Sequence, residues 1–200
     1  QGNADAQYLL GSMYKNGGEL VRQNDTLAVD WYRKAAEQGH AEAQSQLGGM
    51  YETGRGVRQD DTLAVDWYRK SAEQGDVLSQ FWLGRMYWAG RGVRQDRALA
   101  VDWYRKSAEQ GYTEAQLNLG LAFYTGAGVD QDYAQAVDWY RKAAEQGHSL
   151  AQALLGLNYQ YGTGVRQDMS IAKEWFGKSC DNGAQVGCDN YKTLNERGVR

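Results

Sequence analysis

A chain of 200 residues, 42% of them hydrophobic, is long enough to bury a sizeable core, and none of its apolar runs is long enough to cross a membrane. The formal net charge of −3 argues against a protein whose basic surface holds nucleic acid. Proline is absent and glycine occurs 25 times, so the turns must be built with glycine.

A repeat of 36 residues organises the chain, and the first copy has one extra residue in its loop. Each copy opens with a phrase such as QLGGMY (46–51) and continues with a phrase such as AVDWYRKSAEQG (64–75). Self-similarity at this period is typical of stacked helix–turn–helix units. The tryptophans that mark the second phrase are Trp31, Trp67, Trp103, Trp139 and Trp175.

Both phrases predict helices. Ala43, Leu47 and Met50 form one apolar stripe of a first helix, which Gly54 can end by adopting positive φ. Aspartates then stand where each second helix should begin, as N-caps, at Asp60, Asp96, Asp132 and Asp168. Glycines inside the first helices predict close contact with a neighbouring helix, at Gly11, Gly48, Gly84, Gly120 and Gly156.

The second helices carry recurrent aromatic and charged residues. Because the Trp–Tyr pair recurs in every copy, we interpret it as packing between helices rather than as a ligand site. Asp66 with Arg69 and Lys70 is interpreted as a set of local surface pairs.

We expect five units at about 1–39, 40–75, 76–111, 112–147 and 148–183, followed by a capping helix and a frayed tail over 184–200. Gln1 and Gly2 match the end of a repeat, so a longer natural chain is expected. An open first repeat that presents Tyr8 and Leu9 would also favour self-association.

The combined pattern A-x-x-x-L-G-x-x-Y-x-x-G-x-G-V-x-x-D-x-x-x-A-x-x-W-Y-x-x-A-A-x-x-G resembles the Sel-one-like repeat family, a branch of the tetratricopeptide superfamily. The resemblance covers essentially the whole chain. It implies an all-α fold, a right-handed superhelical α/α solenoid whose first helices line the concave side. It also implies a non-enzymatic adaptor that assembles other proteins.

Two cysteines lie eight residues apart on either side of the last glycine turn, Cys180 and Cys188. Their placement resembles the helix-stapling disulfides of the cysteine-rich subgroup of the same superfamily, which implies a disulfide here. A disulfide would place the protein in an oxidising compartment, periplasmic or secreted. The alternative is a reduced pair of small buried residues, and then a cytoplasmic location remains open.

Catalytic interpretations have little support. The two histidines, His40 and His148, each follow a turn glycine, and no spacing indicates a metal site. The S-x-x-K motifs at 12–15 and 170–173 match part of the serine β-lactamase signature, but neither S-D-N nor K-T-G occurs. We therefore predict that the chain is not an enzyme and that it binds no cofactor or metal. A weak penicillin-binding hydrolase is kept as a less likely alternative.

The stretch FWLGRMYWAG (81–90) carries large apolar residues that the corresponding SQLGGMYETG (45–54) lacks. Positions that change between repeats are free to serve a partner, and in the first helices they fall on one stripe. We expect an exposed, mostly apolar patch in the concave groove; the alternative is that these residues pack on one another. The patch comprises Leu78, Phe81, Arg85, Trp88, Leu117, Leu121, Tyr124, Leu157 and Tyr161, while Trp82 on the neighbouring stripe is expected to be partly buried.

The sequence thus predicts a scaffold that binds another protein in its groove. A periplasmic immunity protein that neutralises a secreted effector enzyme is the principal alternative. Binding to a host surface or an antibody by a secreted virulence factor is not separable from the scaffold by sequence.

Overall fold

The computed structural model describes residues 2–18 and 21–199, and within them it contains eleven α-helices and no strand. This confirms the predicted all-α architecture of five helix pairs followed by a last helix. Gln1 and Arg200, the ends of the expected first and last segments, lie outside the described residues. In chain order the helices are α1 Ala4–Asn16, α2 Asp25–Glu37, α3 Ala41–Thr53, α4 Asp61–Glu73, α5 Val77–Ala89, α6 Arg97–Glu109, α7 Thr113–Thr125, α8 Tyr133–Glu145, α9 Ser149–Tyr161, α10 Met169–Asp181 and α11 Gln185–Glu196.

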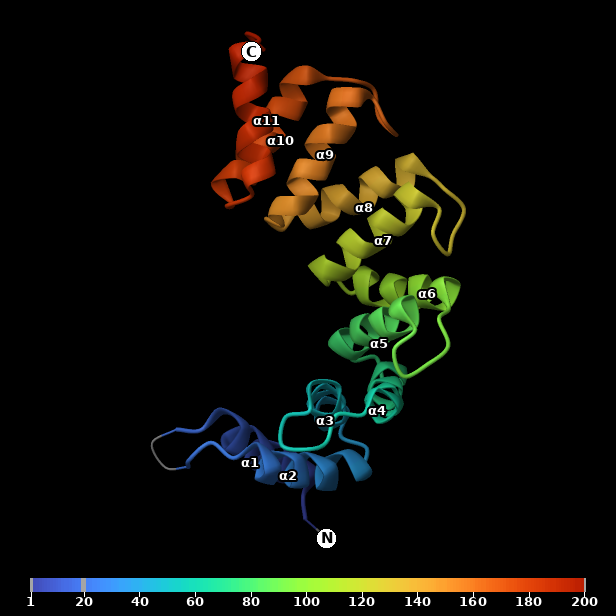
Figure 1. Ribbon diagram of the computed structural model, residues 1–200, viewed down its shortest axis with the longest axis vertical. Helices are drawn as coiled ribbons and strands as arrows, with labels where there is room; N and C mark the ends of the chain where they lie inside the picture. The colour runs from blue at the N-terminus through green and yellow to red at the C-terminus, as the bar shows by residue number, and fades with distance from the viewer. Residues whose placement is uncertain (1, 19–20, 200) are drawn as a thin grey trace. The chain divides into compact units, whose positions relative to one another are not determined.

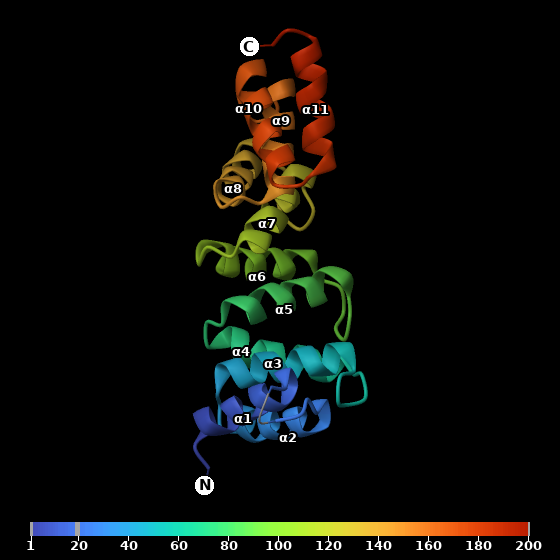
Figure 2. The same cartoon turned by 90° about the vertical axis from the view of Figure 1, so that its left-hand side faces the viewer.

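The chain divides into two compact units, unit 1 (Gln1–Trp103) and unit 2 (Tyr104–Arg200), with the boundary inside α6. In unit 1, each of the helices from α1 to α5 packs on the helices next to it in sequence (Figure 1). In unit 2, α7 to α11 follow the same rule, and α11 also contacts α9 (Figure 2). Each unit therefore builds its core from sequence-adjacent helices.

Aspartate caps start the second helices, as the sequence predicts. The Asp60 carboxylate accepts hydrogen bonds from the backbone amides of Thr62 and Leu63, both at 3.0 Å. Asp96, Asp132 and Asp168 cap the later second helices in the same way. Because the first amides of a helix have no partner inside it, each cap removes an unsatisfied donor.

Glycine inside the first helices permits close helix packing. A Cβ at Gly48 would lie 2.8 Å from Cδ1 of Tyr68, and one at Gly120 would lie 2.7 Å from Cδ1 of Tyr140. These aromatic rings of the second helices are almost completely buried. The predicted close contact is thus confirmed, and its partner is the ring of the second helix in the same repeat.

The recurrent tryptophans are less buried than expected. Trp103 is buried, whereas Trp31, Trp67, Trp139 and Trp175 are half-buried. A lysine ammonium three residues later lies over the ring in each half-buried case, at 4.1 Å from the ring centroid for Lys70 on Trp67. Asp66 pairs with Arg69 at 3.1 Å as predicted, so Lys70 contacts the aromatic face instead of joining that pair.

Polar side chains tie each repeat to the next. Gln44 Nε2 donates to the Ala36 carbonyl oxygen at 3.0 Å, across the turn from α2 to α3. Arg69 Nη2 donates to the Tyr87 hydroxyl at 3.1 Å, joining α4 to α5. The Ala36 carbonyl oxygen also accepts from the Gly39 amide at 3.0 Å, so the glutamine adds a hydrogen bond from the next repeat to the C-terminal end of α2.

A disulfide between Cys180 and Cys188 joins α10 to α11, as the resemblance implies, with the two Cα atoms 4.5 Å apart. The tail that the sequence predicts to fray is partly anchored. Lys173 Nζ donates to the Val199 carbonyl oxygen at 2.6 Å, and Val199 packs beside a small core of Ala172, Phe176 and Leu194.

Candidate functional site

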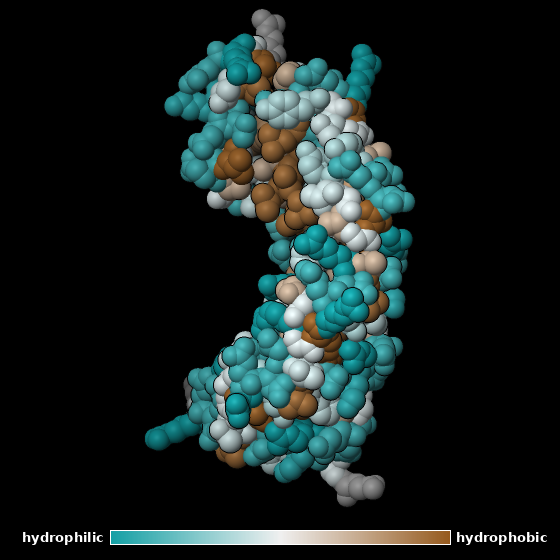
Figure 3. All heavy atoms as spheres, turned by 45° about the vertical axis from the view of Figure 1, so that its right-hand side comes forward, coloured by the Kyte–Doolittle hydropathy of each residue, from teal (hydrophilic) through white to brown (hydrophobic). Residues whose placement is uncertain are grey.

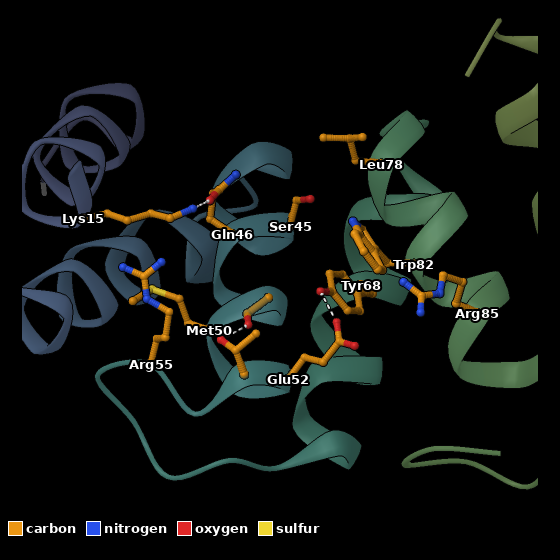
Figure 4. A pocket seen from close by; sticks show the side chains of 12 residues that line it. Lys15, Ser45, Gln46, Met50, Glu52, Arg55, Tyr68, Leu78, Trp82 and Arg85 are labelled. Carbon is orange, nitrogen blue, oxygen red and sulfur yellow. Dashed lines mark hydrogen bonds between the residues drawn. The ribbon is translucent and has the colours of Figure 1, made fainter. Parts of the chain in front are cut away.

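A hollow of about 450 Å³ opens on unit 1 between the first helices of three successive repeats, α1, α3 and α5. Lys15 reaches it from α1, while Leu78, Trp82 and Arg85 line it from α5 (Figure 4). Tyr68 of α4 closes its floor beside Glu52 of α3.

The local sequence explains why the hollow lies here. Along the stripe that varies between repeats, α3 presents Ser45 and Gly49 at the positions where α5 presents Phe81 and Arg85. Small side chains on α3 leave open space, and Arg85 with its neighbours on α5 forms one wall of it, which Phe81 does not line.

The acidic group of the hollow is already neutralised. Glu52 Oε2 accepts a hydrogen bond from the Tyr68 hydroxyl at 2.9 Å, and Oε1 accepts one from Arg91 Nη1 at 2.9 Å. Arg91 also pairs with Asp61 at the start of α4, at 2.8 Å. Burial and the neighbouring Glu52 charge raise the pKa of Tyr68 well above its usual value, so the hydroxyl stays protonated and donates.

The basic groups of the hollow are held in different ways. Lys15 Nζ donates to Gln46 Oε1, and burial together with the nearby Arg55 charge lowers the pKa of Lys15. Arg55 itself makes a two-point contact with Asp25, at 2.9 and 3.2 Å. The Arg85 guanidinium lies over the Trp82 ring, 4.8 Å from its centroid, and remains exposed.

The predicted patch residues of unit 1 fall in three environments. Leu78 is 42% exposed and lines the hollow with Arg85. Phe81 is only 5% exposed, which corrects the expectation that it is exposed. Its ring packs edge-on with that of Trp82, at a centroid distance of 5.2 Å. Trp88 is half-buried beneath the Arg97 guanidinium and does not line the hollow.

The remaining patch residues belong to unit 2. Leu117 is 5% exposed, so its expected exposure is also corrected, and Leu121 and Leu157 are half-buried. Tyr124 and Tyr161 are exposed, and the Tyr124 ring contacts that of Tyr133. Apolar side chains gather on the face of unit 2 that Figure 3 shows. Whether the exposed members of the patch bind a partner remains a prediction.

Sequence reasoning missed several residues that shape the hollow, above all Lys15, Gln46 and Arg55. Trp82 is half-buried as expected, but it forms a wall of the hollow rather than serving packing alone. A signal was present: Lys15 occupies the position in the first repeat that Trp88 holds in the third. Extending the comparison of variable positions to the first repeat would have found it.

The histidines have a structural role that the sequence interpretation did not supply. Nδ1 of His40 accepts a hydrogen bond from the Ala43 amide, and Nδ1 of His148 accepts one from the Ala151 amide. Both are therefore N-caps of first helices. Throughout residues 2–18 and 21–199, no three residues of the types His, Cys, Asp and Glu gather in a way that could hold a metal ion.

Within the described residues, no hydrogen bond joins the serine and the lysine of either S-x-x-K motif. Ser170 and Lys173 line a second hollow of about 430 Å³ in unit 2, but Lys173 donates to a backbone carbonyl oxygen. Lys15 likewise donates to Gln46, and the Ser12 hydroxyl accepts from Asn16 Nδ2 at 3.4 Å. Both lysines are thus engaged as donors elsewhere.

Within the part of the chain that the structure describes, no helix combines the length and apolarity that crossing a membrane requires.

Comparison with known proteins gives consistent results. A family model, the Sel1 repeat, matches residues 4–40, 41–76, 77–112, 113–148 and 149–183. No curated protein matches the chain. A crystal structure of a protective antigen of uropathogenic Escherichia coli, described as displaying an SLR fold, is 39% identical with a TM-score of 0.96 and covers 98% of this chain. This chain spans only 42% of that protein.

Two further structures are similar. A Sel1 repeat protein of Oxalobacter formigenes is 36% identical, with a TM-score of 0.87, and the match covers 98% of this chain and 78% of that one. An immunity protein of Pseudomonas aeruginosa is 21% identical, with a TM-score of 0.54, and the match covers 98% of this chain and 83% of that one. The latter likeness concerns the fold alone.

Proposed function

The chain belongs to the Sel1 repeat family, and on that basis we propose that it is a non-enzymatic scaffold that binds another protein through the exposed face of its first helices. The Sel1 repeat fold suits protein–protein interaction. Stacked repeats present extended surfaces built from equivalent positions of successive helices, which is the geometry that long or modular partners need.

The observation that carries this proposal is the composition of the hollow on unit 1. Its walls include side chains from variable positions of the first helices, among them Lys15, Leu78 and Arg85. Leu78 and Arg85 are exposed there next to the half-buried Trp82. Tryptophan and arginine are among the residue types that are enriched at binding hot spots.

Site-directed photocrosslinking in the native cell tests the proposal. A photoreactive phenylalanine analogue would replace Arg85 in the hollow or, as a control, the exposed loop residue Arg58 outside it. We expect a discrete crosslinked protein from position 85 that is absent from position 58. The absence of a crosslink from position 85, or equal crosslinks from both positions, would count against the proposal.

The second candidate function, a periplasmic immunity or inhibitor protein, is favoured by the Cys180–Cys188 disulfide, because such bonds persist in oxidising compartments. Thiol alkylation of the native protein without reductant tests this location. Protected cysteines in a periplasmic or secreted fraction would support it, whereas free thiols in a cytoplasmic fraction would favour the cytoplasmic alternative.

The penicillin-binding alternative predicts covalent labelling of Ser12 or Ser170 by a fluorescent β-lactam.

A further inference from the structure

We propose that the hollow of unit 1 binds an acidic peptide segment of a partner protein, with carboxylates against Lys15 and Arg85 and an apolar side chain against Trp82 and Leu78. This inference rests on the proposed scaffold function and names the chemistry of its partner. Its basis is the balance of charges around the hollow.

The lining holds three cations and a single acid, namely Lys15, Arg55, Arg85 and Glu52. Glu52 is committed to Arg91 and to the Tyr68 hydroxyl, and Arg55 is committed to Asp25. Lys15 and Arg85 have no carboxylate within 4.0 Å among the residues described, and Asp25 acts on Lys15 only from a greater distance. Even when Arg91, Asp25 and Asp61 are counted with the lining, four cations face three carboxylates. The hollow is locally positive in a chain whose net charge is −3.

Both free cations are held in place before any partner arrives. The hydrogen bond to Gln46 fixes the Lys15 ammonium between α1 and α3, and stacking on Trp82 fixes the Arg85 guanidinium on α5. Side chains that are already ordered lose less conformational entropy when a ligand binds. Burial is the main cause that lowers the pKa of Lys15, and the nearby Arg55 charge lowers it further, so a second cation lies close to the ammonium.

The apolar part of the hollow limits the class of anion. Leu78 and the Trp82 ring offer an aliphatic and aromatic surface between the two cations (Figure 4). A polyphosphate backbone has no apolar group to cover that surface. A peptide that alternates carboxylates with an apolar residue complements both the charge and the surface.

Selection from phage-displayed random peptides tests the inference without assuming a partner. The bait is the purified chain, and one selected peptide is then synthesised with its acids intact or replaced by their amides. Two variants are compared with the parent: Lys15→Gln/Arg85→Gln, and Arg58→Gln/Arg94→Gln, which removes the same net charge from exposed loops of unit 1. All proteins must share the melting temperature of the parent.

We expect selected peptides to be enriched in Asp and Glu next to an apolar residue. The affinity should fall about tenfold for Lys15→Gln/Arg85→Gln and for the amide peptide, should fall with added salt, and should stay within about twofold for the loop variant. Peptides without acidic enrichment, or acidic peptides that bind both double variants equally, would overturn the inference. So would binding of an oligothymidylate with the same dependence on Lys15 and Arg85 in place of acidic peptides.

A third variant separates failure of this inference from failure of the proposed function. Trp82→Gln installs the residue that the second repeat carries at the equivalent position, Gln46. Selected peptides that depend on Trp82 but not on Lys15 and Arg85 would reject the acidic partner and retain the scaffold. If no selected peptide depends on any of the three residues, the acidic-peptide inference fails. The scaffold is then judged by the crosslink from position 85 alone.

Discussion

Two adjacent glycines of α3 lie in different surroundings, and this difference is testable. A Cβ at Gly48 would lie 2.8 Å from the Tyr68 ring, whereas a Cβ at Gly49 would lie 3.4 Å from the Tyr68 hydroxyl. We expect Gly48→Ala to lower the free energy of unfolding by about 1–3 kcal/mol through overpacking. Gly49→Ala should raise it by up to about 1 kcal/mol, because glycine is costly inside a helix. Urea denaturation of both variants would measure the two changes, and effects of the same sign would contradict this account.

Equivalent tyrosines of the second helices also differ in their hydroxyl contacts. The Tyr68 hydroxyl donates to Glu52, whereas the buried Tyr140 hydroxyl has no hydrogen-bond partner in the described part of the chain. Tyr68→Phe should therefore cost about 1–2 kcal/mol of unfolding free energy, and Tyr140→Phe should be neutral or stabilising. Each substitution is the chemical control for the other in thermal and urea unfolding. Equal losses of unfolding free energy in the two variants would show that the hydrogen bonding of the hydroxyl does not determine the change in stability.

At the scale of single residues, the sequence could predict what local rules determine. The aspartate caps and the glycines at helix ends follow from the chemistry of unsatisfied backbone groups. The burial of Phe81 and Leu117 could not be predicted in this way. Helical spacing assigns a residue to a face, but how far the neighbouring helix covers that face depends on packing between helices.

The last helix depends on a covalent tie. The disulfide between Cys180 and Cys188 closes a short loop that includes the turn from α10 to α11. Replacing both cysteines with serine should lower the stability of this region by roughly 2–3 kcal/mol, mainly because the unfolded chain regains freedom. Amide hydrogen exchange should then speed up in α11 (Gln185–Glu196) and stay unchanged in α2 and α3.

A reducing agent provides the matched control for this prediction. It should accelerate exchange in α11 of the parent protein and have no effect on the double serine variant. Uniform acceleration across all helices would mean that the disulfide supports a larger cooperative unit than α10 and α11.

At the scale of helices, the repeated motif predicted the pairs of first and second helices because successive copies carry the same stripe and glycines, and the last four carry an aspartate cap. The recurrent Gln44, Gln80, Gln116 and Gln152, which bond to carbonyl oxygens of the preceding helix, were not singled out. A polar residue repeated inside a buried stripe was the available signal. The hollow itself could not be predicted, because it depends on which side chains of three helices face one another.

Because of buried tyrosines in both units, the free energy of unfolding of the whole molecule should fall as the pH rises through the alkaline range. Burial raises the pKa of Tyr32 to about 12 and also raises the pKa of Tyr68 and of Tyr140 above the usual value. The unfolded chain loses these protons near pH 10. Stability is therefore complete below about pH 10 and should fall as the pH rises toward about 12.

Urea midpoints across this alkaline range would measure the fall. Tyr32→Phe removes one of the titrating groups, so its stability should decline less steeply with pH than that of the parent. An equal slope in both proteins would mean that Tyr32 ionises as freely in the folded state as in the unfolded state.

Within each unit, most contacts run between helices that are neighbours in the sequence, and this arrangement determines how the chain should respond to mechanical load. A fold in which distant segments clamp one another resists stretching until the clamp breaks in one large event. Here a pull on the chain ends would peel one helix from its neighbour at a time. In an optical trap we expect a series of small extension steps at low force, each followed by rapid refolding when the tension is released. A protein of this kind would behave as an extensible spring.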